Sequence, residues 1–406
     1  MAEELIEIEA AREAVLARVE PLAAEDVAVD DALGRVLAEP VTSADPVPPF
    51  DNSAMDGFAV RAGDTAGASA SSPVTLALVG ESRAGHPAGR DVAAGEAIAI
   101  STGAMLSDGA DAVVRVEDSV PGDGSVQVLV EVEPGRNVRR AGEDIARGDT
   151  VLEPGTAIGP AELGVLASVG RERVRCARRP EVCLLTTGDE LQDSGGELRP
   201  GAIRNSNLHS LRALVERAGG VVGASEIVRD DPGATRAALE RALAADIALV
   251  SGGVSIGRHD HVRPMLAELG AEQVFWGVAL RPGKPTWFGT RGATLAFGLP
   301  GNPVSAIVTF TLFVHPAIRA MLGARDPAPG ETTAILEADY AKRPGRAHLV
   351  RCRLELREDG WHATPTGEQG SHLLTSIVGA DAFAVLPTPS ASVRAGERVA
   401  IVTLPR

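Results

Sequence analysis

The sequence predicts a multidomain α/β and β protein built around a central, doubly wound and mostly parallel α/β domain. Between residues 180 and 323, strand-like apolar runs alternate with helix-like segments, a pattern that right-handed βαβ crossovers produce. Residues 51–143 and the segment after residue 327 carry short runs of alternating apolar and polar residues, which are typical of small β domains. A proline-rich stretch at 40–49 indicates a boundary before the first β region.

Before the central domain, the chain is predicted to contain an amphipathic helix over residues 8–20, which Pro21 ends. In the first β region, runs such as 74–79 alternate in the manner of half-buried strands. A turn and a helix that begins near Pro160 are expected before the central domain starts. We interpret the segment after residue 327 as a small C-terminal β-barrel.

Within the central domain the periodicity predicts strands and helices in strict alternation. The strands are expected over 181–187, 221–228, 247–250, 273–280 and 294–299, and the helices over 207–218, 233–244 and 260–269 and from residue 303. Ligands of an open α/β sheet bind at the carboxyl ends of its strands. Polar motifs that directly follow these strands are therefore the first candidates for a functional site.

The composition of the 406-residue chain argues against several classes of partner. A formal charge of −16 opposes non-specific binding of nucleic acid, and an aromatic content of 3% leaves few rings for base stacking. Cys176, Cys183 and Cys352 are too widely spaced for a disulfide framework or a paired metal site. The acidic N-terminus lacks an apolar leader, and no apolar run approaches the roughly 20 residues that span a bilayer. We expect a cytoplasmic protein with neither nucleic acid nor membrane as a partner.

Lys284 stands out because the only other lysine in the chain is Lys342, although lysine and arginine together number 39. It lies between two prolines, in a turn that begins with Arg281. A compact ammonium group suits an oxyanion, whereas a guanidinium imposes a planar fork. The alternative is that Lys284 is an ordinary turn residue.

A helix start at Asn302-Pro303 is a second candidate for anion binding. Asn is a preferred N-cap residue, and Pro suits the first helical position. The free N–H groups of such a helix start, with Ser305 in the first turn, would form an anion site. Capping alone is the alternative, and the presence of Lys284 upstream favours anion binding.

The loop Ser251-Gly252-Gly253 follows a predicted strand and can present successive N–H groups to a phosphate. It matches neither a Walker loop nor a dinucleotide fingerprint. A generic tight turn is the alternative.

Acidic residues stand at successive strand-to-helix junctions, namely Asp189 and Glu190, Asp230 and Asp231, and Asp260. Oxygen ligands held near phosphates are what magnesium requires. Each residue alone is more often a helix cap or a solvated turn residue, and it is their convergence on one edge of the sheet that favours a functional role. His259 and His261 flank Asp260 and suggest zinc, but residues two apart on a helix do not face each other.

In the first half of the chain, the run 50–60 places small and polar residues between prolines and a strand. Its Asp56-Gly57 pair is also compatible with a simple hairpin turn. Further small or charged turns lie at 101–104 and 139–144. We interpret these turns as ligand loops.

Together these motifs resemble the molybdopterin molybdenumtransferase family (MoeA-like), which includes the E domain of gephyrin. The matching stretches occur in family order over nearly the whole chain: PPFDNSAMDG at 48–57, TGA at 102–104, GEDI at 142–145, TGDEL at 187–191, SGGVS at 251–255, PGKP at 282–285 and GLPGNPVS at 298–305. The first and last stretches are long and specific, while the glycine loops alone are not.

The resemblance implies insertion of molybdate into adenylylated molybdopterin, with release of AMP and a requirement for magnesium. It implies an elongated homodimer, with other cofactor-biosynthesis proteins as candidate partners. The expected domains are an N-terminal linker and dimerisation domain (1–45 and 144–178), an inserted small β domain (46–143), a molybdopterin-binding α/β domain (179–326) and a C-terminal β-barrel (327–406). The active cleft would lie between the α/β domain of one subunit and the small β domain of the other.

The resemblance also implies roles for individual residues. The expected catalytic residues are Asp56, Thr102 and Asp144 from the second subunit, and Glu190, Asp230 and Asp260, which would also bind magnesium. The expected substrate-binding residues are Arg139, Arg140, Ser251, Gly252, Gly253, Arg281, Lys284, Pro300, Pro303, Ser305, Arg351 and Ser371.

This chain departs from the family pattern in the basic cluster. Family members often carry lysines where it has Gly277 and Arg281, and an Asp where it has Asn205. Arg281 keeps the charge in a different shape, and Asn205 removes an anion.

Two other functions remain open on the sequence. The α/β domain alone resembles the related molybdopterin adenylyltransferases, although the flanking domains argue against that activity. A gephyrin-like, non-catalytic scaffold is the other, although the chain has no fused second enzyme domain or long linker. No residue distinguishes molybdate from tungstate.

Overall fold

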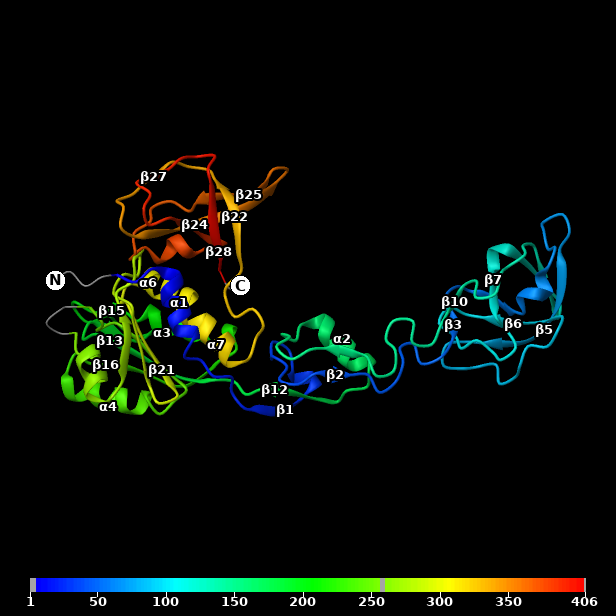
Figure 1. Ribbon diagram of the computed structural model, residues 1–406, viewed down its shortest axis with the longest axis horizontal. Coiled ribbons are helices and arrows are strands. Elements are labelled where there is room, and N and C mark those ends of the chain that lie inside the picture. Colours follow the sequence, from blue (N-terminus) through cyan, green and yellow to red (C-terminus); the bar gives the residue numbers. More distant parts are fainter. Residues whose placement is uncertain (1–4, 256–259, 405–406) are drawn as a thin grey trace.

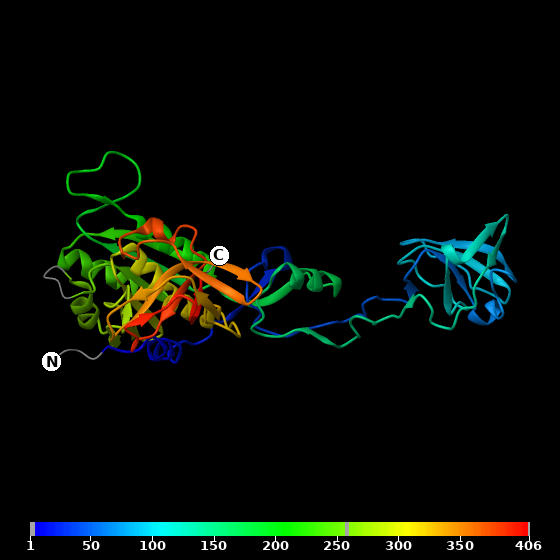
Figure 2. The same ribbon diagram turned by 90° about the horizontal axis from the view of Figure 1, so that it is seen from above.

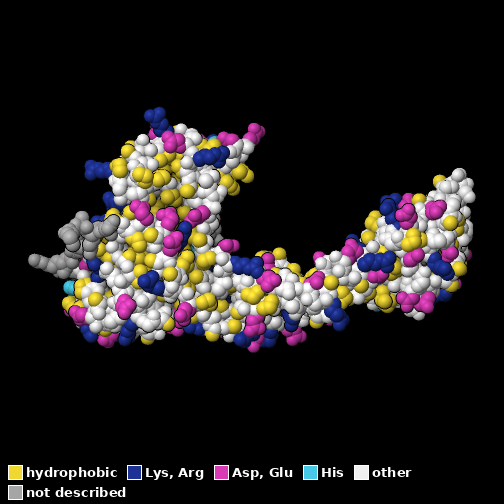
Figure 3. Space-filling model, in the orientation of Figure 1, with side chains coloured by type: hydrophobic (Ala, Val, Ile, Leu, Met, Phe, Trp, Pro, Cys, Tyr) yellow, Lys and Arg dark blue, Asp and Glu magenta, His cyan; other side chains and the backbone are white. Residues whose placement is uncertain are grey.

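The protein is elongated, with a large body at one end and a small β domain at the other (Figures 1 and 2). The computed structural model describes residues 5–255 and 260–404. Two extended segments, one on the way out and one on the way back, join the small β domain to the body. Acidic and basic side chains are interspersed over the described residues of the face shown in Figure 3.

The large body contains the predicted α/β domain. Its sheet has the order β16-β13-β17-β21-β20-β18. Strand β13 runs parallel to β16 and to β17, and β17 runs parallel to β21. The strands are β13 (Glu181–Thr187), β16 (Val221–Val228), β17 (Ile247–Ser251), β18 (Glu272–Trp276), β20 (Trp287–Arg291) and β21 (Thr294–Leu299). The helices are α3 (Ser206–Ala218), α4 (Pro232–Ala242), α5 (Val262–Glu268), α6 (Pro303–Thr309) and α7 (His315–Met321), with the short pair β14 (Leu191–Gln192) and β15 (Ile203–Arg204) after β13.

Strand β13 is a continuous apolar run because helices cover both faces of the sheet. Val182 and Leu184 point into a core shared with α3, α6 and α7, whereas Cys183 and Leu185 point into a second core shared with α4 and α5. A strand buried on both faces has no polar side to show in its sequence. The predicted doubly wound, mostly parallel sheet is confirmed.

One strand of this sheet was not predicted. Strand β20 pairs antiparallel with both β18 and β21, and the strand expected over 273–280 ends at Trp276. The tight turn around Gly292, whose φ is 58°, folds β20 back onto β21 as a hairpin.

The helix that begins at Pro303 contradicts the expectation that no apolar run approaches the length that spans a bilayer. It continues from α6 through the π-helical turn η4 (Phe310–Val314) into α7, over 19 residues, and an 18-residue window within it has a mean hydropathy of 1.5. By length and composition alone this helix could cross a membrane. Because 83% of that window is buried inside the protein, it has the character of a core helix.

The C-terminal region forms the predicted β-barrel. Strands β24, β25, β22, β28 and β26 follow one another around the sheet, and the β24–β26 pairing closes it. The elements are β22 (Glu331–Leu336), β23 (Tyr340–Ala341), β24 (Ala347–Arg357), β25 (Gly360–Pro365), η5 (Leu374–Ile377), β26 (Ala382–Leu386), β27 (Ser392–Val393) and β28 (Arg398–Thr403). In addition, β19 (Leu280–Arg281) of the central domain pairs with β24.

In the connecting region, strands from before and after the small β domain pair with each other. The pairs are β1 (Ala24–Ala28) with β12 (Arg173–Ala177), β2 (Val41–Thr42) with β11 (Thr150–Leu152), and β3 (Asn52–Ser53) with β10 (Val138–Arg139). Helix α2 (Pro160–Ser168) begins at the predicted proline, and the short turn η1 (Val29–Asp31) precedes it in sequence.

Helix α1 (Ile8–Leu16) is shorter than predicted. It packs against the α/β domain, although in the sequence it precedes the connecting region. Ile8, Ala11 and Val15 belong to the core of the α/β domain, against η4 and α7.

The small β domain contains a six-stranded sheet of order β7-β4-β6-β5-β9-β8. Its elements are β4 (Gly57–Val60), η2 (Ala62–Thr65), β5 (Val74–Ser82), β6 (Glu96–Ile100), β7 (Ala112–Arg115), η3 (Val116–Asp118), β8 (Ser119–Gly122) and β9 (Ser125–Val128).

His315 at the start of α7 predicts a pH dependence of stability. Burial lowers the pKa of His315 from 6.5 to about 4, and a nearby guanidinium, that of Arg319, adds to the effect. Between these pH values the unfolded state binds the proton and the folded state does not, so stability falls as the pH drops from 6.5 to about 4. The full loss from this residue is about 3 kcal/mol, at 1.4 kcal/mol per pKa unit.

We expect the variant His315→Gln to be less sensitive to acid than the parent. Urea unfolding at pH 7.5 and at pH 4.5 measures this difference, with pH 7.5 as the internal reference because His315 is neutral there in both states. An equal loss of stability in parent and variant would show that His315 does not titrate in this way.

Candidate functional site

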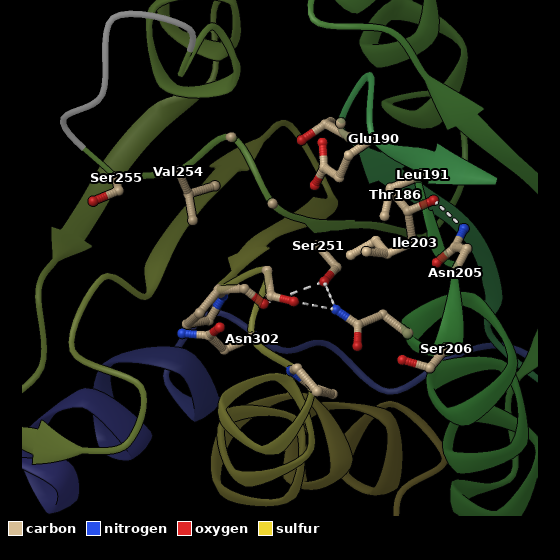
Figure 4. A pocket seen from close by; sticks show the side chains of 18 of the residues that line it. Thr186, Glu190, Leu191, Ile203, Asn205, Ser206, Ser251, Val254, Ser255 and Asn302 are labelled. Atoms are coloured by element: carbon tan, nitrogen blue, oxygen red, sulfur yellow. Dashed lines mark hydrogen bonds between the residues drawn. The ribbon is translucent and has the colours of Figure 1, made fainter. Parts of the chain in front are cut away.

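A cavity of about 660 Å³ lies at the carboxyl edge of the central sheet, where the polar motifs were expected (Figure 4). The loops after β13, β16, β17 and β21 line it, together with the start of α3. Predicted site residues that it brings together are Glu190, Asp230, Ser251, Gly252, Gly253, Asp260, Pro300 and Pro303.

The glycines of the loop after β17 are required by close packing. Gly252 and Gly253 have φ values of 100° and 66°, which only glycine adopts readily. A Cβ atom on Gly252 would lie 2.7 Å from the hydroxyl oxygen of Thr187 and 2.8 Å from its carbonyl oxygen. The loop therefore lies directly against the end of β13, with its backbone on the cavity wall.

Asn207 ties three walls of the cavity together, and sequence reasoning did not single it out. Its Nδ2 donates to Ser251 Oγ (2.9 Å) and to the carbonyl oxygen of Gly301 (2.7 Å), and Ser251 Oγ donates to the carbonyl oxygen of Pro300 (3.2 Å). Because a carbonyl oxygen can only accept, the contact with Gly301 settles which end of the amide is nitrogen. The hydroxyl proton of Ser251 is thus donated to a backbone carbonyl group of the protein.

The structure separates cavity-lining carboxylates from helix caps. Asp231 accepts from the backbone N–H of Ala234 (2.8 Å) and caps α4, whereas Asp230 lines the cavity. Asp230 and Asp189 bond reciprocally through backbone N–H and carboxylate, at 3.3 and 3.4 Å, which ties the ends of β13 and β16 together.

Asn205, where the family resemblance led us to expect an acidic residue, is also a helix cap. It accepts from the N–H of Leu208 (3.2 Å) at the start of α3 and donates to Thr186 Oγ1 (2.8 Å). An amide can make both bonds at once, whereas a carboxylate could only accept.

The acidic set suits magnesium in its chemistry. Among the described residues no group of three His, Cys, Asp or Glu side chains is arranged to hold a metal ion. Magnesium is commonly bound by one or two carboxylates together with substrate phosphates, and the donors here are oxygen atoms. His259 lies outside the described residues, and His261 directly precedes α5 without a side-chain capping bond.

A second cavity, of about 230 Å³, adjoins the first and has the opposite charge. The two share Pro285, Pro300 and Asn302 as lining residues. Arg281, Lys284 and Arg346 line the small cavity with Ser305, Gln369 and Ser371, and no carboxylate is among its described lining residues. This cavity concentrates positive charge in a chain whose formal charge is −16.

Pairing between domains brings Arg346 into this cavity. In the β19–β24 pair, Leu280 lies opposite Ala347, so Arg346 is held beside the turn that carries Lys284. Sequence reasoning missed Arg346 and Gln369, because nothing local to either residue signals this pairing.

Helix α6 begins at the predicted position, but its N-cap differs from the expected one. Asn302 has extended backbone angles and makes no side-chain capping bond. Instead, the N–H of Val304 donates to the carbonyl oxygen of Ser371 (3.2 Å), which links the helix start to the C-terminal barrel.

Arg351 lines neither cavity. It is completely buried, and its guanidinium donates to the carbonyl oxygens of Glu368, Gln369 and Gly370 at 3.1 to 3.4 Å. These bonds hold the loop that carries Gln369 and Ser371 against the small cavity.

The remaining predicted residues lie around the small β domain, at the other end of the molecule (Figure 1). The N–H and hydroxyl of Thr102 donate to Asp56 Oδ1, at 2.7 and 3.1 Å. Arg139 is exposed in β10, and the N–H of Asp144 donates to the carbonyl oxygen of Val47 (3.0 Å).

Arg140 belongs to the same group and forms an ion pair with Asp51. The backbone N–H of Ala141, and then the Arg140 guanidinium, lower the pKa of Asp51 below its usual range. Within one chain this distal group does not meet the cavities.

Family models match three consecutive parts of the chain. They are described as the MoeA N-terminal region (domain I and II) at residues 6–170, a probable molybdopterin binding domain at 183–320, and the MoeA C-terminal region (domain IV) at 333–404. Among solved structures, the molybdopterin biosynthesis moeA protein from Pyrococcus horikoshii OT3 matches with a TM-score of 0.86 and 31% identity, over 98% of this chain and 100% of that one.

Curated relatives match at the level of the whole chain. A molybdopterin molybdenumtransferase from Haemophilus influenzae is 37% identical over 94% of both chains. A protein of the same name from Staphylococcus aureus is 33% identical, over 93% of this chain and 90% of the relative. From its fold, its cavities and these relatives, we conclude that this chain belongs to the molybdopterin molybdenumtransferase family of enzymes in molybdenum cofactor biosynthesis.

Proposed function

We propose that this transferase inserts molybdate into adenylylated molybdopterin and releases AMP in a magnesium-dependent reaction. The observation that carries the proposal is the pair of adjoining cavities, one lined by carboxylates and the other by cations, with Pro285, Pro300 and Asn302 between them. The volume of about 660 Å³ suits a nucleotide-sized substrate.

The small cavity supplies the chemistry for an oxyanion. Lys284 offers a compact charge, and Arg281 and Arg346 offer forked donors that match the oxygens of a tetrahedral anion. Ser305 and Ser371 add hydroxyl donors from two different domains. Molybdate held there would stand beside the pterin end of a substrate in the larger cavity.

In the larger cavity, Glu190, Asp230 and Asp260 would hold magnesium together with phosphate oxygens of the substrate. Magnesium, when bound, offsets the negative charge that develops as AMP leaves. The glycine loop and Asn207 keep the walls in place, so positioning contributes much of the rate.

The distal group would complete the site in a homodimer. Asp56, Thr102, Arg139, Arg140 and Asp144 lie around the small β domain, far from the cavities of their own chain. A second subunit that places these residues over the larger cavity would supply further polar groups to the substrate.

Release of AMP from adenylylated molybdopterin tests the proposal, measured with and without molybdate and magnesium. We expect release to require both, and tungstate run in parallel reports on the choice of oxyanion. ATP consumption with molybdopterin and no molybdate would instead identify an adenylyltransferase. Partner binding that survives loss of the cavity carboxylates, with no AMP release in the parent, would identify a scaffold.

A further inference from the structure

Trp276 touches residues on both sides of Asp260 without lining either cavity itself. It stands at the end of β18, and its indole Nε1 donates to the carbonyl oxygen of Val254 (3.0 Å). The guanidinium carbon of Arg263 lies 3.8 Å from the centre of its ring system. Val254 precedes Asp260 in the sequence, and Arg263 follows it.

The two segments that Trp276 contacts lie side by side. The N–H of Val262 donates to the carbonyl oxygen of Gly253 (3.3 Å), and a Cβ atom on Gly253 would lie 2.8 Å from Val262 Cγ2. Figure 4 shows Val254 and Ser255 at the side of the cavity where this chain segment leaves β17. Trp276 therefore bridges two adjacent segments, residues 253–254 and 262–263, which we call the neck. Asp260, which lines the cavity, lies close in sequence to the second segment.

The contacts at this neck are of kinds that fix positions. Val254 is buried, and within the described part of the chain the indole N–H is the donor to its carbonyl oxygen, so loss of this bond is expected to be costly. A guanidinium over an indole face is attracted by the ring's electron density and holds its side chain in place. Indole is rigid, with few torsions to order when it makes both contacts.

We propose that Trp276 is a positioning residue for the reaction, which sets the place of Asp260 through Val254 and Arg263. This inference rests on the proposed role of Asp260 in holding magnesium. Loss of Trp276 should therefore weaken the use of magnesium and leave the binding of molybdate, in the other cavity, as it was.

Two substitutions separate the two contacts of Trp276. Trp276→Phe keeps an aromatic face for Arg263 and removes the N–H donor, whereas Trp276→Leu removes both. For Trp276→Leu we expect the magnesium concentration at half-maximal AMP release to rise about tenfold, and for Trp276→Phe about threefold. The KM for molybdate should stay within about twofold in both, and saturating magnesium should restore most of kcat.

Trp361→Leu is the matched control, because Trp361 lies on the C-terminal barrel, remote from the neck, and is partly exposed. It should leave the magnesium dependence unchanged. Thermal melts of all variants identify any loss of folding, and the Phe variant keeps the test valid if the Leu variant unfolds. A magnesium dependence in folded Trp276→Phe and Trp276→Leu equal to that of Trp361→Leu would overturn the proposal.

A double-mutant cycle with Asp260→Asn distinguishes positioning from a general structural effect. If Trp276 acts through Asp260, Trp276→Leu should not raise the magnesium requirement further in the Asp260→Asn background. Additive effects would contradict the inference. If Asp260→Asn alone left the magnesium dependence unchanged, the assignment of Asp260 to magnesium would fail, which is a separate outcome.

Tryptophan fluorescence gives a readout that does not depend on turnover. Addition of magnesium with AMP to the parent should change its emission, because Trp276 is coupled to the cavity wall. The change should persist in Trp361→Leu and be lost in Trp276→Phe and in Asp260→Asn. Persistence of the full change in Trp276→Phe would overturn the coupling.

Discussion

Mixed dimers are expected to recover activity that neither parent variant has. In the proposed homodimer, every site of an Asp56→Asn or an Asp230→Asn variant lacks one carboxylate, and we expect AMP release to fall about 100-fold or more, as when a charge-stabilising group is removed. In a dimer with one subunit of each kind, one of the two sites is assembled from intact halves. An equal mixture forms about half such dimers, so it should regain about a quarter of parental activity by random pairing.

The physical reason is the distance between the two groups within one chain. The Asp56–Thr102 pair stands at the end of the molecule opposite the cavity that Asp230 lines (Figures 1 and 2). The measurement is AMP release after the two variants are unfolded together and refolded. As a reference, Asp56→Asn is mixed with Asp123→Asn, which changes an exposed turn residue of the same domain. The activity of this mixture shows how much is recovered when one of the two subunits carries no site defect. Activity of the first mixture no higher than that of its parents would contradict a shared site.

Replacement of Lys284 by alanine is expected to raise the KM for molybdate about 100-fold. A charge-assisted hydrogen bond contributes about 1.5–3 kcal/mol, and 1.4 kcal/mol corresponds to a factor of ten. Because Arg281 and Arg346 remain, kcat at saturating molybdate should change far less. Lys284→Arg should be intermediate, since a planar fork keeps the charge but does not fill the same place.

The matched control for Lys284→Ala is Arg343→Ala, which removes an exposed cation that does not line the small cavity. Initial rates of AMP release over a range of molybdate concentrations provide the measurement. Unchanged rates at subsaturating molybdate in Lys284→Ala would show that Lys284 does not bind the oxyanion.

Much of the fold could be predicted because local patterns report burial directly. The run at 181–187 predicted β13, and the predicted limits of β16 and β21 agree with the structure. Strands β13 and β21 are buried between layers of helices, whereas β16 is an edge strand that is mostly exposed or half-buried. The alternation after residue 327 predicted a barrel, since each of its strands has one face inside. Strand β20 escaped prediction because it lies between a lysine turn and a glycine turn, with no periodicity of its own.

The candidate site, like the fold, could be predicted only in part. The glycine loop at 251–253 and the carboxylates after β13, β16 and β17 were predicted, because strand ends in a parallel sheet meet at one edge. Which carboxylate of a neighbouring pair faces the cavity was not predicted. Asp231 caps α4 while Asp230 lines the cavity, and this depends on where the helix begins in space.

By itself, the sequence determined the family, the order of the domains and the strand ends at which ligand groups gather. Only the tertiary structure decided that Arg346 joins Arg281 and Lys284, that Arg351 is a buried support, and that Trp276 spans the neck beside Asp260. The reason is physical. Periodicity and turn chemistry act over a few residues, whereas these contacts arise from strand pairing and packing between segments far apart in the chain.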